Sequence, residues 1–518
     1  MDTQSGMPNG GTGMRADRGN VPREICEFFG KPGSRSLIIK GGAGSGKTTL
    51  ALQLMEEVAP PDRSFYLSTR VSDASLYIQF PWLREKDMRS RIIDASREFL
   101  ASIYKPEEED GPARKEKQSR VRGARDFLRS IQKEPAPPTV DRTCLSKISE
   151  TANIPEITRL YDRVESKLPA SSFFVIDSVE GIAGRYRLEP EGLVHALQKD
   201  LVERSGAHMV VILEKGGDTS VDYLVDGVVL LDKRDIEGRR VREVRLDKLR
   251  ATEIRRQAYL VTLRDGRFRA FEPYRPGGAA QKWAGVPDTT THYSSGTRDL
   301  DELLGGGFRK GSYNVIEVAE NVTTEEYYSL VRPVLLNFVG QGRGVIVVLP
   351  GGDQAETLRD DLTRFIERGV FDRYVQVADY FIQETKKPYV MALGTRNKEE
   401  ALRNWRTVLQ NLRGSENRPI MDFAGFDTLE YLRGNDIAIR DLFNTVGRIK
   451  ISADVGVGII KPGLKLTQEI MNMADTYLKI VDLHNTCCIF GVNPHTIVYA
   501  ITPDPEKGMP HVRLNPVV

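Results

Sequence analysis

The sequence predicts an α/β protein with a mostly parallel sheet in its first half and a second domain after it. The chain has 518 residues, which exceeds the usual size of one hydrophobic core. Short apolar runs alternate with segments of helical periodicity through the first half, as in proteins built from βαβ units. A stretch rich in proline and glycine then separates the two halves.

Composition narrows the class of protein. Apolar residues make up 40% of the chain, charged residues 28%, and the net charge is +2, as in a soluble globular protein. The four cysteines form no CxxC pair, which favours a reducing cytoplasm. The first 20 residues carry no apolar signal segment, and no run of 18 apolar residues occurs. We therefore expect a cytoplasmic protein that neither spans nor binds a membrane.

The domain boundaries follow from these changes in composition. We expect a disordered N-terminus at 1–20, a first domain at 21–273, a linker at 274–291 and a second domain at 292–518. An Arg-rich insertion at about 97–150 interrupts the first domain.

A glycine loop between a strand and a helix is the strongest motif. The strand SLIIK at 36–40 leads into GGAGSGKT and then into TTLALQLMEEV with helical spacing. GxxxxGK[ST] points backbone N–H groups at a phosphate in front of a helix N-terminus. The alternative is a Gly-rich turn that binds nothing. The predicted nucleotide-binding residues are Gly41, Gly42, Ala43, Gly44, Ser45, Gly46, Lys47, Thr48 and Thr49.

The remaining residues of a nucleotide site follow from this loop. Lys47 should reach the β- and γ-phosphates, and the Thr48 hydroxyl should bind Mg²⁺. The apolar strand in SSFFVIDSVEG, 171–181, ends in Asp177, which should orient the metal unless it only caps the next turn. No guanine-specific N-K-x-D occurs, which favours ATP with Mg²⁺ as the ligand.

Further elements complete an alternating series. Strands are expected at 62–69, 89–96, 206–215 and 226–234, and a helix at 154–168. With VREVRLDKLRAT after them, this order resembles the KaiC-like branch of the RecA superfamily. The resemblance implies that Lys248 and Arg250 of a K-x-R motif enter a neighbour's nucleotide site in a homo-oligomeric ring, of which a hexamer is one form. The alternative is a basic hairpin that faces water.

The second half resembles the opening of another KaiC-like domain in HYSSGTRDLDELLGGGFRKGSYNVIEV, 292–318, which implies an internal repeat and two tandem RecA/KaiC-like domains. Its next loop, AENVTTEEYY at 319–328, has neither glycine nor lysine. Glu325 and Glu326 would repel phosphate there. We expect a degenerate second domain that lacks an ATP site and serves structure or interaction. A strand at 419–427 stands where the second copy's metal-binding strand is expected.

The sequence departs from the KaiC-like pattern at the position of the catalytic base. KaiC-like proteins carry paired glutamates after the second strand, where this chain has Thr69 and Arg70. Asp73 and Glu180 are the nearest carboxylates, and neither has the family's spacing. A general base supplies a rate enhancement of roughly 10²–10⁴-fold, which is lost when the base is misplaced. Binding of ATP should survive and hydrolysis should be slow, so whether the protein is an enzyme stays open.

The first 85 residues, with VPREICEFFGKPGSRSLIIKGGAGSGKTTLALQL, YLSTRVS and QFPWL, also resemble the GvpD family of archaeal P-loop regulators of gas-vesicle formation. The insertion contributes a basic stripe that is either a charged surface hairpin, a phosphate contact for nucleic acid or a dock for an acidic protein. Its basic residues are not interleaved with aromatic ones, as stacking on single-stranded nucleic acid would need, which favours a protein partner. Its basic residues are Arg114, Lys115, Lys117, Arg120, Arg122, Arg125 and Arg129.

These features predict an ATP-binding regulatory protein whose nucleotide state controls oligomerisation or partner binding. Lys47, Asp177, Lys248 and Arg250 would carry any slow hydrolysis. The alternative is a RecA-like, DNA-stimulated ATPase in recombination or repair, which needs the base that is missing. A scaffold with a vestigial loop is a third reading. It fits poorly, because the loop is intact in one copy and lost in the other.

Overall fold

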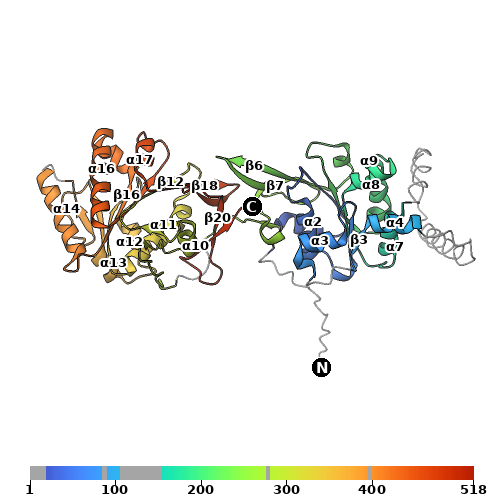
Figure 1. Ribbon diagram of the computed structural model, residues 1–518, viewed down its shortest axis with the longest axis horizontal. Helices are drawn as coiled ribbons and strands as arrows, with labels where there is room; N and C mark the ends of the chain where they lie inside the picture. Colours follow the sequence, from blue (N-terminus) through green and yellow to red (C-terminus); the bar gives the residue numbers. More distant parts are fainter. Residues whose placement is uncertain (1–18, 85–89, 105–153, 276–280, 395–397) are drawn as a thin grey trace, which may run out of the picture. The chain divides into compact units, whose positions relative to one another are not determined.

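The computed structural model describes residues 19–84, 90–104, 154–275, 281–394 and 398–518 (Figure 1). These residues form two compact units. The first unit runs to Lys233 and includes Arg242–Ala258 and Leu263–Ala270, and the second comprises Arg234–Val241, Tyr259–Thr262 and Phe271–Val518. Most of the expected insertion, and most of the N-terminus expected to be disordered, lie outside the described residues.

A nine-stranded sheet forms the core of the first unit, in the order β3-β2-β4-β5-β1-β6-β7-β8-β9, although the tip of the β6–β7 hairpin and most of β8 are counted with the second unit. The pairs from β3 to β6 in this order are all parallel, so their carboxyl ends meet at one edge. The strands are β1 Ser36–Gly41, β2 Ser64–Ser68, β3 Ile92–Asp94, β4 Phe173–Asp177, β5 His208–Leu213, β6 Gly227–Ile236, β7 Arg239–Leu249, β8 Ala258–Thr262 and β9 Arg269–Ala270. Ligands bind at such an edge in open α/β sheets, so this edge is where a site is expected.

Helices cover both faces of this sheet because alternate side chains of each buried strand point to opposite sides. Ile38, Phe174 and Ile176 join α7, α8 and α9 in one core. On the opposite face Phe173 packs edge to face on Phe29 of α1, with ring centroids 5.2 Å apart. The helices are α1 Arg23–Gly30, α2 Lys47–Glu57, α3 Asp73–Gln79, α4 Ala95–Tyr104, α7 Pro155–Glu165, α8 Val179–Tyr186 and α9 Pro190–Leu197. Single turns or short helices lie at Pro61–Arg63, Pro81–Arg84, Gln198–Arg204, Ser220–Tyr223 and Arg264–Gly266.

The second unit repeats this sheet. Its order is β15-β14-β13-β16-β17-β12-β18-β19-β20-β21, which matches the first sheet strand for strand once the extra edge strand β15 is set aside. The tandem RecA-like fold class is therefore confirmed. The strands are β12 Tyr313–Val318, β13 Gly344–Val348, β14 Val375–Asp379, β15 Val390–Ala392, β16 Ile420–Gly425, β17 Val455–Ile460, β18 Thr476–Leu483, β19 Thr486–Asn493, β20 Tyr499–Pro503 and β21 Val512–Pro516.

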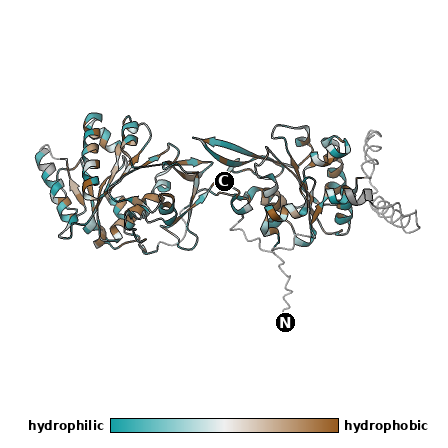
Figure 2. Ribbon diagram, viewed as in Figure 1, coloured by the Kyte–Doolittle hydropathy of each residue, from teal (hydrophilic) through white to brown (hydrophobic). Residues whose placement is uncertain are grey.

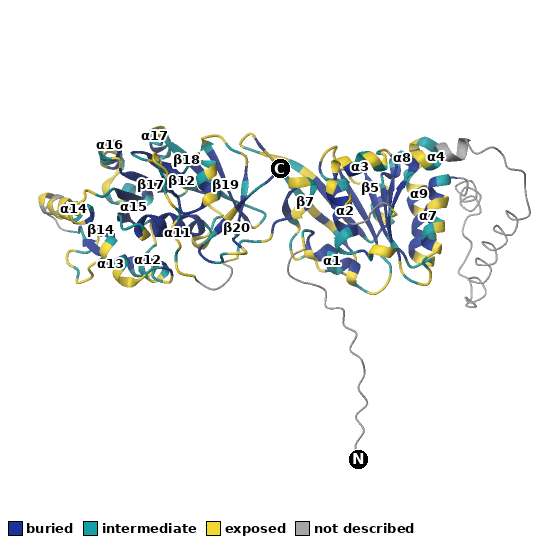
Figure 3. Cartoon of the chain, turned by 60° about the horizontal axis from the view of Figure 1, so that its bottom comes forward, coloured by how far each residue is buried: buried dark blue, intermediate teal, exposed yellow. Residues whose placement is uncertain are grey.

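The second unit also has helices on both faces of its sheet. Helix α11 packs Leu330 and Val334 against one face, and α16 packs Leu442 and Val446 against the other. The central strands of each sheet are rich in apolar residues (Figure 2) and buried (Figure 3). The helices are α10 Arg298–Leu303, α11 Thr324–Gly340, α12 Ala355–Leu362, α13 Arg368–Tyr374, α14 Lys398–Arg413, α15 Phe426–Arg433, α16 Asn435–Ser452 and α17 Thr467–Met473. A two-stranded ribbon, β10 His292–Tyr293 and β11 Phe308–Arg309, stands apart from the sheet.

Segments that precede residue 292 also pack in the second unit. The Arg239 guanidinium donates to the carbonyls of Gly491 and Thr496 at 2.6 and 2.7 Å. In the linker, Trp283 stacks on His511 with centroids 4.8 Å apart, and its backbone N–H donates to Phe365 O at 3.0 Å. The tip of the β6–β7 hairpin and Trp283 are therefore parts of the second unit. Among the described residues, no helix is both long and apolar enough to cross a membrane.

Candidate nucleotide-binding site

The glycine loop joins β1 to α2 at the carboxyl edge of the first sheet, and its backbone conformation requires glycine. Gly44 and Gly46 have φ of 67° and 106°. A Cβ at Gly46 would lie 2.9 Å from the Leu263 methyl groups, and one at Gly41 only 2.3 Å from Leu231 O. The glycines therefore allow the turn and the close approach of neighbouring chain.

Lys47 lies in the first turn of α2 with its side chain folded over the loop. Its Nζ donates to the carbonyls of Gly41 and Gly42 at 2.7 and 2.9 Å. Burial lowers the pKa of Lys47, and the nearby carboxylates of Glu214, Asp177 and Glu180 oppose that shift. The ammonium is thus held at the loop among three acidic groups.

Thr48 and Asp177 meet beside the loop, as the metal-binding prediction requires. Thr48 Oγ1 donates to Asp177 Oδ2 at 2.6 Å, and Tyr66 of β2 donates to the same oxygen at 2.5 Å. Burial, reinforced by the charge of Asp177, raises the pKa of Tyr66 well above its usual value. The phenol therefore stays protonated and acts only as a donor here. A hydroxyl beside a carboxylate supplies the oxygen ligands that Mg²⁺ prefers, so these residues fit the ion.

The end of β2 carries no carboxylate, and its side chains are otherwise engaged. Thr69 is buried, accepts a hydrogen bond from the Ser178 N–H at 2.8 Å and lies 3.0 Å from Asp177 O. Arg70 forms an ion pair with Glu214, which follows β5. Thr69 therefore stabilises the carboxyl end of β4 through hydrogen bonds, and Arg70 pairs with a carboxylate that follows β5.

The structure adds two residues that the sequence argument did not single out. Glu214 lies beside Glu180, because its N–H donates to Glu180 Oε1 at 2.7 Å. Strand β6 pairs in parallel with β1 and sets Leu231 opposite Gly41, so Lys233, two residues further along β6, lies beside the glycine loop. The Nζ of Lys233 donates to Ala43 O at 2.6 Å. Glu214 follows β5 and Lys233 lies within β6, the two strands that pair with β1, and only the strand order could have drawn attention to them.

Lys248 and Arg250 contact the segment that precedes β6, on the side of the sheet where β1 begins. Lys248 Nζ donates to the carbonyls of Asp222 and Val225 at 2.9 and 2.7 Å, and Arg250 lies 3.4 Å from an Asp226 oxygen. The Asp226 N–H in turn donates to Ser36 O at the start of β1. A six-residue strand such as β1 spans about 17 Å, so Arg250, near the start of this strand, lies far from the glycine loop at its end. Their predicted role in a neighbour's site stays a prediction.

The corresponding edge of the second unit is closed by its own side chains. Glu326 accepts hydrogen bonds from the N–H and hydroxyl of Thr323 at 2.7 and 2.8 Å, in a capping box at the start of α11. This carboxylate occupies the helix end that would otherwise favour a phosphate. Strand β16, the counterpart of β4, ends in Gly425 where β4 ends in Asp177. The described part of this edge therefore lacks the glycine loop, the lysine and the strand-end aspartate that the first unit has.

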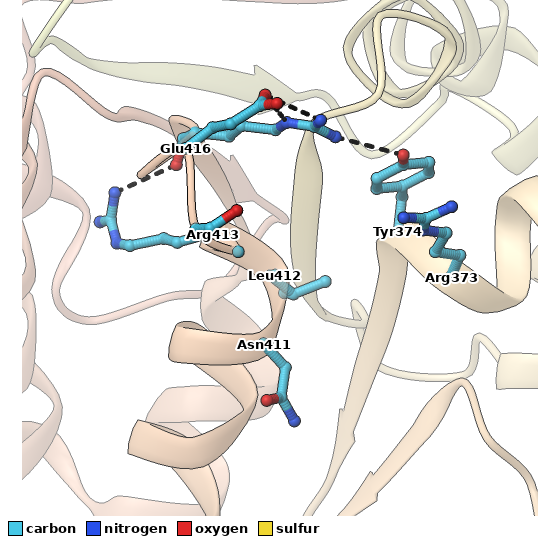
Figure 4. A pocket seen from close by; sticks show the side chains of 9 residues that line it. Arg373, Tyr374, Asn411, Leu412, Arg413 and Glu416 are labelled. Atoms are coloured by element: carbon cyan, nitrogen blue, oxygen red, sulfur yellow. Dashed lines mark hydrogen bonds and ion pairs between the residues drawn. The ribbon is translucent and has the colours of Figure 1, made fainter.

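A separate basic pocket of about 140 Å³ lies in the second unit (Figure 4). Its guanidinium groups are engaged: Arg418 donates to Glu416 and to the Tyr374 hydroxyl, and Arg413 pairs with the buried Asp454. Arg373 lies over the Tyr374 ring. The arginines that line the pocket are therefore engaged with neighbouring groups, and the pocket shares no residue with the glycine-loop site.

Comparison with known proteins links both units to one family. Residues 25–100 match the GvpD gas vesicle protein P-loop domain, and residues 282–407 match GvpD basic region 2. The protein GvpD2 of Halobacterium salinarum is 24% identical over 96% of this chain and 96% of its own length. GvpD1 of the same organism is 26% identical over 70% of this chain and 62% of its own length. The chain is thus a GvpD-like P-loop protein, and the predicted resemblance to that family is confirmed.

Proposed function

We propose that this GvpD-like protein is an ATP-responsive regulator of gas-vesicle formation, in which nucleotide at the first unit controls oligomerisation or partner binding. One observation carries the proposal. The first unit holds a formed glycine loop with the Thr48–Asp177 pair beside it, whereas the second unit caps its corresponding helix with Glu326. One chain would then bind one nucleotide and present a second, nucleotide-free unit for other contacts.

The first step is binding of the phosphates. The loop N–H groups and the α2 N-terminus favour an anion, and Lys47 adds a charge that can exchange its two carbonyl contacts for phosphate oxygens. Thr48 and Asp177 would hold Mg²⁺, which neutralises phosphate charge when bound. The Lys47 contacts change on binding, so the loop itself would report nucleotide.

The second step is transmission to the second unit, and strand β6 offers a direct covalent route. Lys233 on this strand contacts the loop at Ala43, and the next residues, from Arg234 to Val241, belong to the second unit. There Arg239 is anchored on two carbonyls and lies over the Phe490 ring at 4.4 Å. A shift of Lys233 on nucleotide binding would therefore act on a segment fixed in the second core.

Assembly is the proposed output. Lys248 and Arg250 contact the segment before β6, and Arg250 lies near the start of β1, so we assign them a role at the phosphate of a neighbouring chain. Burial and the charge of Arg250 lower the pKa of Lys248, which leaves its ammonium easier to neutralise than a free lysine. A homo-oligomeric ring would let these cations meet a γ-phosphate, and the Arg-rich insertion would remain available for a protein partner.

The test joins binding, assembly and the cellular output. Purified protein is titrated with a fluorescent ATP analogue, and its mass is followed by light scattering with and without MgATP, beside Lys47→Ala and Lys248→Ala. Lys199→Ala is the matched control, since Lys199 lies on the surface and pairs with Glu203 of the same helical segment. We expect Lys47-dependent binding, and ATP-driven growth in mass that Lys248→Ala reduces. A constant monomer mass at every ATP concentration would remove assembly from the proposal.

The regulatory role is tested in an archaeal host that forms gas vesicles. Expression of the wild-type chain should change vesicle content, and Lys47→Ala should abolish that change while Lys199→Ala preserves it. Equal vesicle content in all of these strains would contradict a role in gas-vesicle formation and leave the nucleotide site to another function.

A further inference from the structure

Three carboxylates act on the Lys47 ammonium, and the structure distinguishes them by what they already contact. They belong to Glu214, Asp177 and Glu180. Asp177 receives hydrogen bonds from Thr48 and Tyr66, and Glu214 is paired with Arg70. Glu180 is the one whose second carboxylate oxygen has no partner among the described residues.

Glu180 lies in the first turn of α8, three residues beyond Asp177, at the edge where the glycine loop opens. Its Oε1 accepts the Glu214 N–H at 2.7 Å, which fixes the carboxylate between β4 and β5. Its Oε2 is shielded from solvent and unpaired within the part of the chain that the structure describes. A shielded, unpaired acceptor destabilises the folded chain, so its retention calls for a ligand or a bound water.

We infer that Glu180 is the catalytic base that activates water for ATP hydrolysis in this protein. This inference rests on the proposed ATP binding. Oε2 accepts a proton from the water whose oxygen bonds to the γ-phosphorus. The bond from that phosphorus to the β,γ-bridging oxygen breaks, and the products are ADP and inorganic phosphate, with the proton leaving Glu180 to solvent. The mechanism is therefore complete within one chain apart from any cation that a neighbour supplies.

The other acids near the loop suit this role less well. Asp73, at the start of α3, accepts a hydrogen bond from its own neighbour, Ala74 N–H, at 2.7 Å and is not among the charges that act on Lys47. Glu214 would have to release Arg70 before it could take a proton. The Arg70–Glu214 pair instead fixes the chain whose N–H orients Glu180, so both are positioning residues.

The experiment compares ATP turnover and ATP binding in the same samples of wild-type chain, Glu180→Gln, Glu180→Asp and Lys47→Ala. Glutamine keeps an oxygen for the Glu214 N–H and removes only the base. Glu203→Gln, at a surface ion pair with Lys199, is the control. We expect Glu180→Gln to lower kcat by about 10²-fold or more while its ATP affinity stays within about threefold. Glu180→Asp should retain more turnover than Glu180→Gln, and Glu203→Gln should match wild type.

A second readout is the nucleotide that stays bound after incubation with MgATP. Glu180→Gln should retain ATP, whereas the wild-type chain should retain ADP. Turnover by Glu180→Gln within threefold of wild type, or a wild-type chain that binds ATP without any Lys47-dependent turnover, would overturn the assignment while leaving ATP sensing intact. Equal ATP binding by Lys47→Ala and wild type would instead overturn the proposed function itself.

Discussion

Thr48 and Asp177 are 129 residues apart in the chain, yet their side chains share a hydrogen bond of 2.6 Å beside the glycine loop. Strand order brings them together, because β5 is the single strand between β1 and β4. Tyr66 donates to the same Asp177 oxygen and holds the carboxylate in place. The pair is the part of the site that we expect to bind the metal.

Asp177→Asn should weaken binding of MgATP. An amide oxygen can still accept from Thr48 and Tyr66, but it lacks the charge that Mg²⁺ requires, so we expect a loss of about tenfold or more in affinity. Titration with MgATP and with ATP in EDTA checks this. The variant should differ from wild type only when Mg²⁺ is present, and equal affinity for MgATP would exclude Asp177 from the metal site.

Lys233→Gln should weaken ATP binding without unfolding the first unit. Lys233 is partly exposed and contacts Ala43 O, so removal of its charge should cost about 1 kcal/mol, or roughly fivefold in affinity. The effect should shrink at high salt because the group is solvated. Lys199→Gln provides the control, and an unchanged affinity at low salt would mean that Lys233 does not sense the phosphates.

Gly181→Ala should destabilise the first unit by about 1–3 kcal/mol because the new Cβ would lie 2.2 Å from Thr69 Oγ1. Gly184→Ala, in the same helix with open space around its Cβ, should instead be neutral or stabilising by up to about 1 kcal/mol. Urea unfolding measures both. Combining Gly181→Ala with Thr69→Ala should cost less than the sum of the single variants, and strict additivity would refute the contact.

His208 should make the first unit more stable as pH rises. Burial and the charge of Arg35 lower its pKa from the ordinary value of 6.5, and its Nδ1 accepts the Arg35 N–H at 3.1 Å. The unfolded chain therefore binds the proton first as pH falls below 6.5, and the free energy of unfolding decreases until the pH passes the folded pKa. His208→Asn should flatten this dependence in urea unfolding between about pH 5 and 7. The exposed His195→Asn should keep it, and equal slopes in the two variants would disprove the assignment.

Local motifs were predictable from sequence because neighbouring residues define them. The glycine loop needs a strand before it and a helix after it, and the structure has β1 and α2 there. The absence of glycine and lysine from 319–328 is likewise visible in the sequence. The capping box in which Glu326 occupies the helix N-terminus depends on side-chain geometry and was visible only in the structure. The repeated sheet order likewise supports the predicted internal repeat.

The sequence by itself determined the fold class, the glycine loop, the strand that ends in Asp177 and the loss of the loop's glycines and lysine from the second copy. Each of these depends on residues close together along the chain. Only the tertiary structure decided which distant strand ends meet. Parallel pairing of β1 with β6 brings Lys233 to the loop. Pairing of β4 with β5 and with β2 brings Glu214 to Glu180 and Arg70. The tertiary structure also sets Lys248 against the segment that precedes β6. Contacts of this kind arise from pairing between segments far apart in sequence, which local propensity does not encode.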